Sequence, residues 1–284
     1  MSALPAHAGP VFDISLDFSG GTSFSASQKE TFRTAEKIWE YLIPSYAYDV
    51  ASSGAPSSLI ISASSPNIDG VGGTLGSAGP SSLFTGTDLS ASQSYAYAGT
   101  GSMNFDIADI DDIETTGNLL ALIMHEMGHV LGFGTIWDPG TAYQSVYQAG
   151  SGEYTGAAAI AAYQSEIDSG ATFVPVELGG GAGTANGHWN EVDNGSGSDG
   201  RNPDGSFSTT DITNELMTGW LNNNAYVSTF TVASFQDIGY DVLADYETMT
   251  LLELQALVTS VPLPAGAVLL ISALGGLGLA RRRS

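Results

Sequence analysis

The chain has 284 residues, 43% of them hydrophobic, and a formal net charge of −23 at pH 7, so it can bury a substantial core in one large domain or two subdomains. So acidic a surface repels phosphate backbones, which argues against nucleic-acid binding and is typical of a solvated, secreted protein. The chain contains no cysteine, which excludes a disulfide framework, a thiolate zinc site and latency through a cysteine, and leaves histidine and carboxylate side chains as metal ligands.

Residues 1–10 lack the basic start and the apolar core of a signal peptide. Ala6-His7-Ala8 nevertheless resembles the A-x-A cleavage site at which such a peptide ends. Two interpretations stay open. Either residues 1–10 are the remnant of a signal peptide and the mature chain begins near Gly9, or they form a disordered terminus.

Three strands and a helix are predicted within the first hundred residues. Residues 11–18 alternate apolar and polar side chains, the period of a half-buried strand, and residues 58–63 and, more weakly, 95–98 indicate two more strands. The segment 27–30, Ser-Gln-Lys-Glu, has the pattern of a capping box at a helix start. Apolar residues then recur at helical spacing until Pro44, namely Phe32, Ala35, Trp39 and Leu42. We expect this helix to pack on the sheet.

Residues 70–80, GVGGTLGSAGP, are rich in glycine. A loop is the simplest interpretation, because glycine supplies unusual backbone angles and allows close approach. A functional alternative is an edge segment beside a cleft, which pairs with an extended peptide substrate.

Four carboxylates cluster just before the next helix, at Asp106, Asp109, Asp111 and Asp112. Acidic residues near a helix N-terminus interact favourably with the macrodipole, so this cluster needs no ligand. The alternative is a calcium site, since clustered carboxylates on a loop suit a hard cation.

The stretch 119–137, LLALIMHEMGHVLGFGTIW, contains candidate metal-binding and catalytic residues. We predict a helix over residues 116–131, with Gly132 as the left-handed cap at its C-terminus. His125 and His129 lie four residues apart, so their Cβ atoms are about 5–6 Å apart on one helix face and both imidazoles can bind one metal ion. Glu126 lies beside them, where it can hold and deprotonate a metal-bound water. The pattern H-E-x-x-H therefore indicates a zinc-peptidase site.

Two histidines leave a catalytic zinc site short of its usual three protein ligands. The chain has four histidines, and His7 lies in the uncertain N-terminus, so His188 is the other histidine available as a third ligand. A site completed by glutamate remains open at this point, with Glu153, Glu166 and Glu191 as candidates.

The second half of the chain is less regular. Residues 138–187 are polar and rich in glycine and alanine, which indicates an insertion with one helix near 157–167. Residues 193–205 alternate Asp, Asn and Gly, which is typical of a surface loop and alternatively of a second calcium loop. Residues 214–220, NELMTGW, predict a turn that carries Met217, and residues 229–238 a short helix capped by Gly239.

The C-terminal tail differs in composition from the rest of the chain. Residues 261–265, VPLPA, precede an apolar run over 265–280 and three terminal arginines. The run is shorter than the about 20 residues of a spanning helix, so it is marginal as a permanent anchor. The tail resembles the VPLPA-type sorting signals of exported bacterial proteins, which implies membrane contact until a sorting enzyme processes it. A plain tail anchor is an alternative, whereas the arginines and continuous apolarity argue against a buried helix.

The segments HEMGHVLGFGTIW, GHWNE and NELMTGW together resemble the leishmanolysin-type metallopeptidases, a branch of the metzincins. Most metzincins carry H-E-x-x-H-x-x-G-x-x-H in one run, whereas the leishmanolysin branch delays the last histidine past an insertion, as this chain does. The resemblance implies His125, His129 and His188 as ligands of one catalytic Zn²⁺, Glu126 as the general base and Met217 as the Met-turn below the metal. Leishmanolysin itself has disulfides and a cysteine latency switch, which this chain lacks.

The expected fold is α+β and metzincin-like. Residues 11–134 form an N-terminal subdomain of twisted mixed sheet with two helices, residues 135–246 a mostly irregular subdomain across a cleft, and residues 247–284 a linker with the sorting segment. The expected function is that of an exported, monomeric zinc endopeptidase acting on peptides or proteins. The alternative is an exported adhesive or structural protein on an inactive scaffold.

Overall fold

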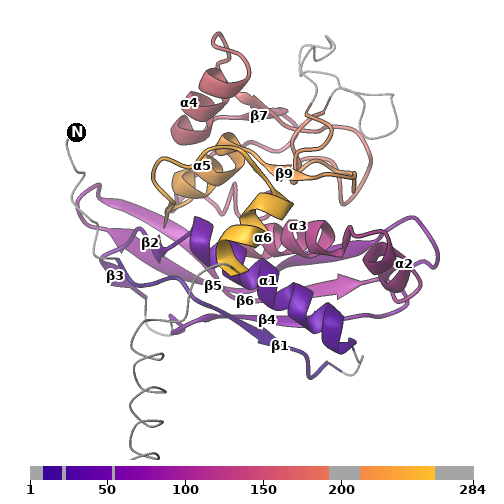
Figure 1. The fold of residues 1–284 in the computed structure, drawn as a ribbon. Helices are drawn as coiled ribbons and strands as arrows, with labels where there is room; N and C mark the ends of the chain where they lie inside the picture. Colours follow the sequence, from indigo (N-terminus) through magenta and orange to yellow (C-terminus); the bar gives the residue numbers. More distant parts are fainter. Residues whose placement is uncertain (1–8, 21–23, 53–54, 192–211, 260–284) are drawn as a thin grey trace, which may run out of the picture.

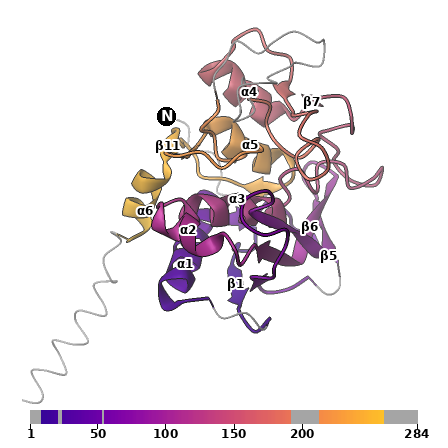
Figure 2. The same ribbon diagram turned by 90° about the vertical axis from the view of Figure 1, so that its right-hand side faces the viewer.

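The computed structural model describes residues 9–20, 24–52, 55–191 and 212–259, and Figure 1 shows their α+β fold. A curled mixed sheet carries helices on one face, and the second half of the chain lies over those helices. The helix α3 (Leu119–Leu131) therefore lies between the sheet and the C-terminal elements, as both views show (Figures 1 and 2). The α+β class that the sequence predicts is confirmed.

The sheet has five strands in the order β1-β4-β6-β5-β3. They are β1 (Ile14–Asp17), β4 (Leu59–Ser64), β6 (Gln93–Phe105), β5 (Gly76–Asp88) and β3 (Val50–Ala51). The first three are parallel, whereas β5 runs antiparallel to β6 and to β3, so the sheet is mixed, as expected. Because β3 pairs only with Gly86 and Thr87, the outer edge of β5 near Gly76 faces no strand in the described part of the chain.

The helix α1 (Ala26–Leu42) connects the parallel strands β1 and β4. The capping box predicted at Ser27 is wrong: the N-cap is Ser25, which accepts a hydrogen bond of 3.1 Å from the amide of Gln28 and donates its own amide to the Gln28 side chain at 2.8 Å. Gln28 is buried and also donates to Asp111 at 2.9 Å. A glutamine in the third helical position serves the box as well as a glutamate does, and its burial sets the helix start.

The buried face of α1 packs against α3 and the sheet. Its buried apolar residues are Phe32, Ala35, Ile38, Trp39 and Leu42, the set that recurs at helical spacing with Ile38 added. The indole of Trp39 donates a hydrogen bond of 3.0 Å to the carbonyl of Met124 in α3. Burial of these side chains stabilises the helix by roughly 1.5–3 kcal/mol for each large one, and it fixes α3 next to α1.

Two strand predictions need correction. Residues 11–18 form a strand only over β1, and Val11 is 75% exposed while Phe12 is buried, so the alternation does not begin at Val11. The weak strand at 95–98 is part of the central strand β6. Small residues obscure the pattern of β6, and Gly101 shows why: a side chain there would collide with Val130 of α3. The small residues let the helix lie close to the sheet.

The described part of the second half of the chain combines loops with three short helices. The helices α4 (Ala157–Glu166) and α5 (Thr229–Asp237) confirm the predictions at 157–167 and 229–238. Short ladders tie the loops together: β7 (Glu153–Tyr154) with β8 (Val174–Pro175), β9 (Tyr226–Val227) with β11 (Met249–Thr250), and β10 (Tyr240–Asp241) with β2 (Ser45–Tyr46). The last of these fastens the second half to the first.

Residues 247–259, which the sequence places in a linker, form β11 and the helix α6 (Leu251–Thr259). Leu254 is fully buried and α6 packs against α1. The apolar tail and its sorting motif lie outside the described residues, as do residues 1–8. Among the helices that are described, none combines the length and the apolarity of a membrane span.

Docking of α6 predicts a difference between two leucines of the same helix. Leu254→Ala should lower the free energy of unfolding by about 2–5 kcal/mol, because it leaves a cavity in the core. Leu252 is 75% exposed, so Leu252→Ala should change it by less than about 0.5 kcal/mol. Urea unfolding of both variants measures these values. Equal effects would show that α6 does not belong to the folded core.

Candidate metal centre

The helix α3 that carries H-E-x-x-H begins three residues later than predicted. A separate short helix, α2 (Ile110–Thr115), precedes it, and Gly117 with φ of 82° reverses the chain between the two. The predicted end is correct: α3 stops at Leu131, and Gly132 caps it with φ of 125°. A left-handed residue without Cβ is needed there, because a side chain on Gly132 would contact Ile238 at 2.9 Å.

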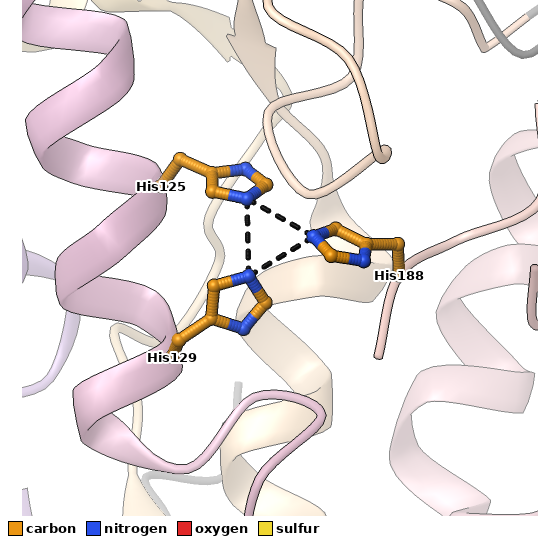
Figure 3. A group of neighbouring side chains, drawn as sticks. All are labelled: His125, His129 and His188. Carbon is orange, nitrogen blue, oxygen red and sulfur yellow. Dashed lines mark hydrogen bonds between the residues drawn. The ribbon is translucent and has the colours of Figure 1, made fainter. Parts of the chain in front are cut away.

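Three histidine side chains converge at one point (Figure 3). His125 and His129 project from successive turns of α3, and His188 reaches them from the loop after the insertion. The Nε2 atoms lie 3.0 Å apart for His129 and His125, 3.0 Å for His129 and His188, and 3.1 Å for His125 and His188. Within the described ranges, these three residues are the one group of His, Cys, Asp or Glu able to share a metal ion.

The glutamates considered as alternative ligands lie elsewhere. Glu153 is exposed in β7, and Glu166 at the end of α4 binds Thr229 and Thr248. Glu191 is buried near the loop of His188 but does not belong to the cluster.

A backbone carbonyl fixes the tautomer of each histidine. The Nδ1 atoms lie 2.7 Å from the carbonyl oxygen of Leu216 for His125, 2.9 Å from that of Phe133 for His129, and 2.8 Å from that of Thr184 for His188. A carbonyl oxygen only accepts, so each Nδ1 carries the proton and each Nε2 presents a lone pair.

The surroundings of the three imidazoles favour their neutral form. Burial lowers the pKa of His125, takes that of His129 well below its usual value and lowers that of His188 to about 3; the neighbouring histidines add to the effect for the last two. Neutral rings whose protons are on Nδ1 cannot donate hydrogen bonds to one another through Nε2. The three Nε2 lone pairs therefore repel each other unless a cation lies between them.

The donor set fits a zinc ion. Tetrahedral zinc with Zn–N bonds of about 2.0–2.1 Å separates its nitrogen ligands by roughly 3.3 Å, close to the 3.0–3.1 Å between the Nε2 atoms. Imidazole also binds copper, iron and nickel, so the three histidines could hold a metal ion without their donor atoms deciding which metal. Comparisons with protein-family models, with curated proteins and with solved structures give no match to this chain.

Glu126 lies beside the histidines and lines the same cavity of about 700 Å³. Glu126 is 5% exposed, and its Oε2 has no hydrogen-bond partner in the described structure. Burial raises the pKa of Glu126 to about 8. On the other side of the carboxyl group runs β5, where a methyl group at Gly76 would lie 2.6 Å from Oε1. Glu126, the candidate for the general base, is thus enclosed between α3 and β5.

Met217 lies on the buried side of α3. It is fully buried in the turn predicted at 214–220, and a methyl group at Gly128 would lie 2.9 Å from its sulfur. Gly128 therefore leaves the space into which Met217 packs, one residue before His129. Sequence reasoning missed Gly128, although a glycine inside a helix costs about 1 kcal/mol relative to alanine and is a signal of close packing.

A second pair of glycines lets His188 reach the helix. Gly134 has φ of 71°, and a methyl group there would lie 2.5 Å from the carbonyl oxygen of Gly187. The chain leaving α3 thus touches the backbone just before His188. Any side chain at Gly134 would push the third histidine away, a constraint that the sequence alone did not reveal.

The acidic cluster before α3 has a role that the sequence did not predict. Asp106 accepts hydrogen bonds of 2.8–3.0 Å from the amides of Ile68, Asp69 and Gly70 at one oxygen and 2.8 Å from Ala108 at the other, and these bonds lower its pKa. Asp109 accepts one from Gly72 at 2.8 Å.

These carboxylates fasten the glycine-rich loop that leads into β5. Only Asp111 and Asp112 fit the macrodipole interpretation, and they do so in α2. Calcium at Asp106 would compete with four amides for its oxygens. The second calcium loop, at 193–205, lies outside the described residues.

Removal of the third histidine should abolish metal binding. His188→Ala leaves two ligands, and we expect the affinity for Zn²⁺ to fall by more than about 100-fold, beyond the effect of losing an outer-sphere partner. Glu153→Gln is the matched control and should bind one equivalent of zinc as the unmodified chain does. Metal content after dialysis measures both. Full zinc content in His188→Ala would assign the third ligand to another residue.

Proposed function

We propose that this chain is a zinc-dependent endopeptidase of the leishmanolysin-like metzincin type. The observation that carries the proposal is the convergence of three Nε2 lone pairs beside the unpartnered, buried carboxyl oxygen of Glu126, in one open cavity. A structural zinc site is closed by four protein ligands, whereas a catalytic site has three and an open position. Three histidines next to a cavity agree with the second arrangement.

In this proposal the three histidines bind the ion, and backbone carbonyl groups orient the histidine rings. His125, His129 and His188 bind through Nε2, while the carbonyl groups on their Nδ1 atoms keep the rings in place. When bound there, zinc supplies Lewis-acid chemistry: it acidifies water and polarises a peptide carbonyl.

Glu126 moves the proton. As a carboxylate it accepts a proton from the attacking water, whose oxygen forms the new bond to the carbonyl carbon. It then delivers that proton to the amide nitrogen as the C–N bond breaks, so the products are a carboxylic acid and an amine. Its burial raises the pKa of Glu126 above that of an ordinary glutamate, which makes the carboxylate a stronger base for the first step.

A peptide substrate agrees with the edge of β5. Residues 73–78 line the cavity on one side, and no described strand pairs with the outer edge of β5 at this point. An extended peptide adds to such an edge through main-chain hydrogen bonds. The opposite wall includes Leu216, Trp220 and Leu221, which offer apolar contact to side chains of a bound peptide. The substrate segment would cross the cavity above the histidines.

Export and a monomeric state belong to the proposal, with membrane contact through the tail before its processing. The rival proposal is an exported adhesive or structural protein on an inactive scaffold. A buried, unpartnered carboxyl group beside a metal site favours the enzyme, because a binding scaffold has no need of a general base and leaving such a group without a partner costs about 1–3 kcal/mol or more.

Replacement of the general base separates catalysis from metal binding. Glu126→Gln keeps the size of the side chain but cannot accept the proton, so casein hydrolysis should fall by about 10²–10⁴-fold while zinc content stays at one equivalent. The assay compares zinc-loaded protein with and without a chelator, and Glu153→Gln is the control with unchanged activity. Undiminished hydrolysis by Glu126→Gln would refute the mechanism. A zinc-loaded wild-type protein that cleaves neither casein nor a peptide library would favour the inactive scaffold.

A further inference from the structure

Glu215 is a buried carboxylate that the proposed mechanism does not use. It is 2% exposed and lies two residues before Met217 in the turn below α3. Its Oε2 accepts a hydrogen bond of 2.6 Å from the amide of Met217. Its Oε1 accepts three more: 3.2 Å from the amide of Ser228, 2.8 Å from the Ser228 hydroxyl and 2.6 Å from the hydroxyl of Thr231. The turn is thereby fastened to the N-terminus of α5.

One arm of this network leads to His125. Leu216 lies between Glu215 and Met217, and its carbonyl oxygen accepts the Nδ1 proton of His125 at 2.7 Å. The bond from the Met217 amide to Glu215 closes a tight loop around Leu216. The direction of that carbonyl, and with it the orientation of the His125 ring, depends on the carboxylate.

The other arm leads to His188. The hydroxyl of Thr231 donates to Glu215 and accepts a hydrogen bond of 2.7 Å from the indole of Trp189, the residue after His188. The amide of Trp189 also donates to the carbonyl of Met217 at 3.0 Å. The segment that supplies the third histidine is thus joined to the turn twice, by its backbone and by a relay that ends on Glu215.

Only an acceptor fits this position. All four groups around the carboxylate are donors, and an ionised carboxylate is the side chain that accepts without donating. A glutamine could keep its oxygen toward Ser228 and Thr231, but its NH₂ group would then face the N–H of Met217. The conservative replacement therefore breaks one specific bond and leaves the size of the side chain unchanged.

We propose that Glu215 is a positioning residue of the metal centre: its carboxylate holds the Leu216 carbonyl and, through Thr231, the Trp189 segment, so that His125 and His188 direct Nε2 to the same point. The assignment rests on the proposed metal centre. It adds to that centre a group that touches neither metal nor substrate and connects two ligands from distant parts of the chain.

Asp237 provides the matched control, because it is a carboxylate with the same kind of role at the other end of α5. It accepts hydrogen bonds from the amides of Ala158 at 2.8 Å and Ala159 at 2.9 Å, and so fastens α5 to α4. Its hydrogen bonds to Tyr154, Ala158 and Ala159 reach neither a histidine of the cluster nor the carbonyl partner of one. Asp237→Asn should destabilise the fold without altering the metal centre.

The test measures zinc affinity by competition with a chelator, and the absorption spectrum of the cobalt-loaded protein, for Glu215→Gln and Asp237→Asn. We expect the dissociation constant for zinc to rise about 10–100-fold in Glu215→Gln, the range for lost outer-sphere partners, with a changed cobalt spectrum. Asp237→Asn should keep the affinity and the spectrum of the wild type, although its melting temperature falls.

If Glu215→Gln does not fold, Thr231→Val is the test variant. It removes only the hydroxyl that joins Glu215 to the indole of Trp189, and it should weaken zinc binding. Wild-type zinc affinity and cobalt spectrum in a folded Glu215→Gln would overturn the assignment. If Glu215→Gln does not fold, the same result in Thr231→Val would overturn it. An equal loss of zinc affinity in Asp237→Asn would overturn it as well. A wild-type protein that binds no metal would refute the proposed metal centre first, which distinguishes the two failures.

Discussion

The central constraint of this structure is the placement of three unprotonated imidazole nitrogens within 3.1 Å of one another. Each ring is held by a carbonyl group that accepts a hydrogen bond from the only N–H of a neutral imidazole. Such an arrangement is unfavourable on its own, because burial also removes the water that would otherwise solvate the lone pairs. A cation bound between the three nitrogens would relieve this repulsion, and the cluster could hold one.

Close backbone contacts help to bring the ligands together, in addition to the hydrophobic core that joins the two halves of the chain. Glycines stand where helix, strand and loop approach: Gly101 between β6 and α3, Gly128 under Met217, and Gly134 against Gly187. Buried carboxylates also fix segments near the site through hydrogen bonds: Asp106 holds the loop before β5, and Glu215 holds the turn below α3. In a chain without cysteine, glycine contacts and carboxylate-to-amide bonds take over the bracing that disulfides provide elsewhere.

Local patterns predicted the parts of the site that depend on neighbouring residues. The spacing of His125 and His129 fixed their common face, Gly132 marked the end of the helix, and α4 and α5 lie where the sequence predicted helices. The convergence of His188 with the helix was expected only by resemblance, because His188 follows His129 by 59 positions in the sequence. No local pattern specifies such a contact.

The missed features all depend on distant partners. Ser25 rather than Ser27 caps α1 because Gln28 is buried against Asp111, and β6 is central although its residues are small because α3 lies on it. Glu215 looked like an ordinary turn residue, since its four donors come from the turn and from α5. A polar side chain shows its role only when its partners are known.

X-ray absorption at the zinc edge of the zinc-loaded protein tests the central claim most directly, since it counts the donors around the ion and measures their distances. The account predicts three imidazole nitrogens at about 2.0–2.1 Å and one oxygen donor from solvent. A shell with two imidazoles, or one made of carboxylate oxygens alone, would contradict it.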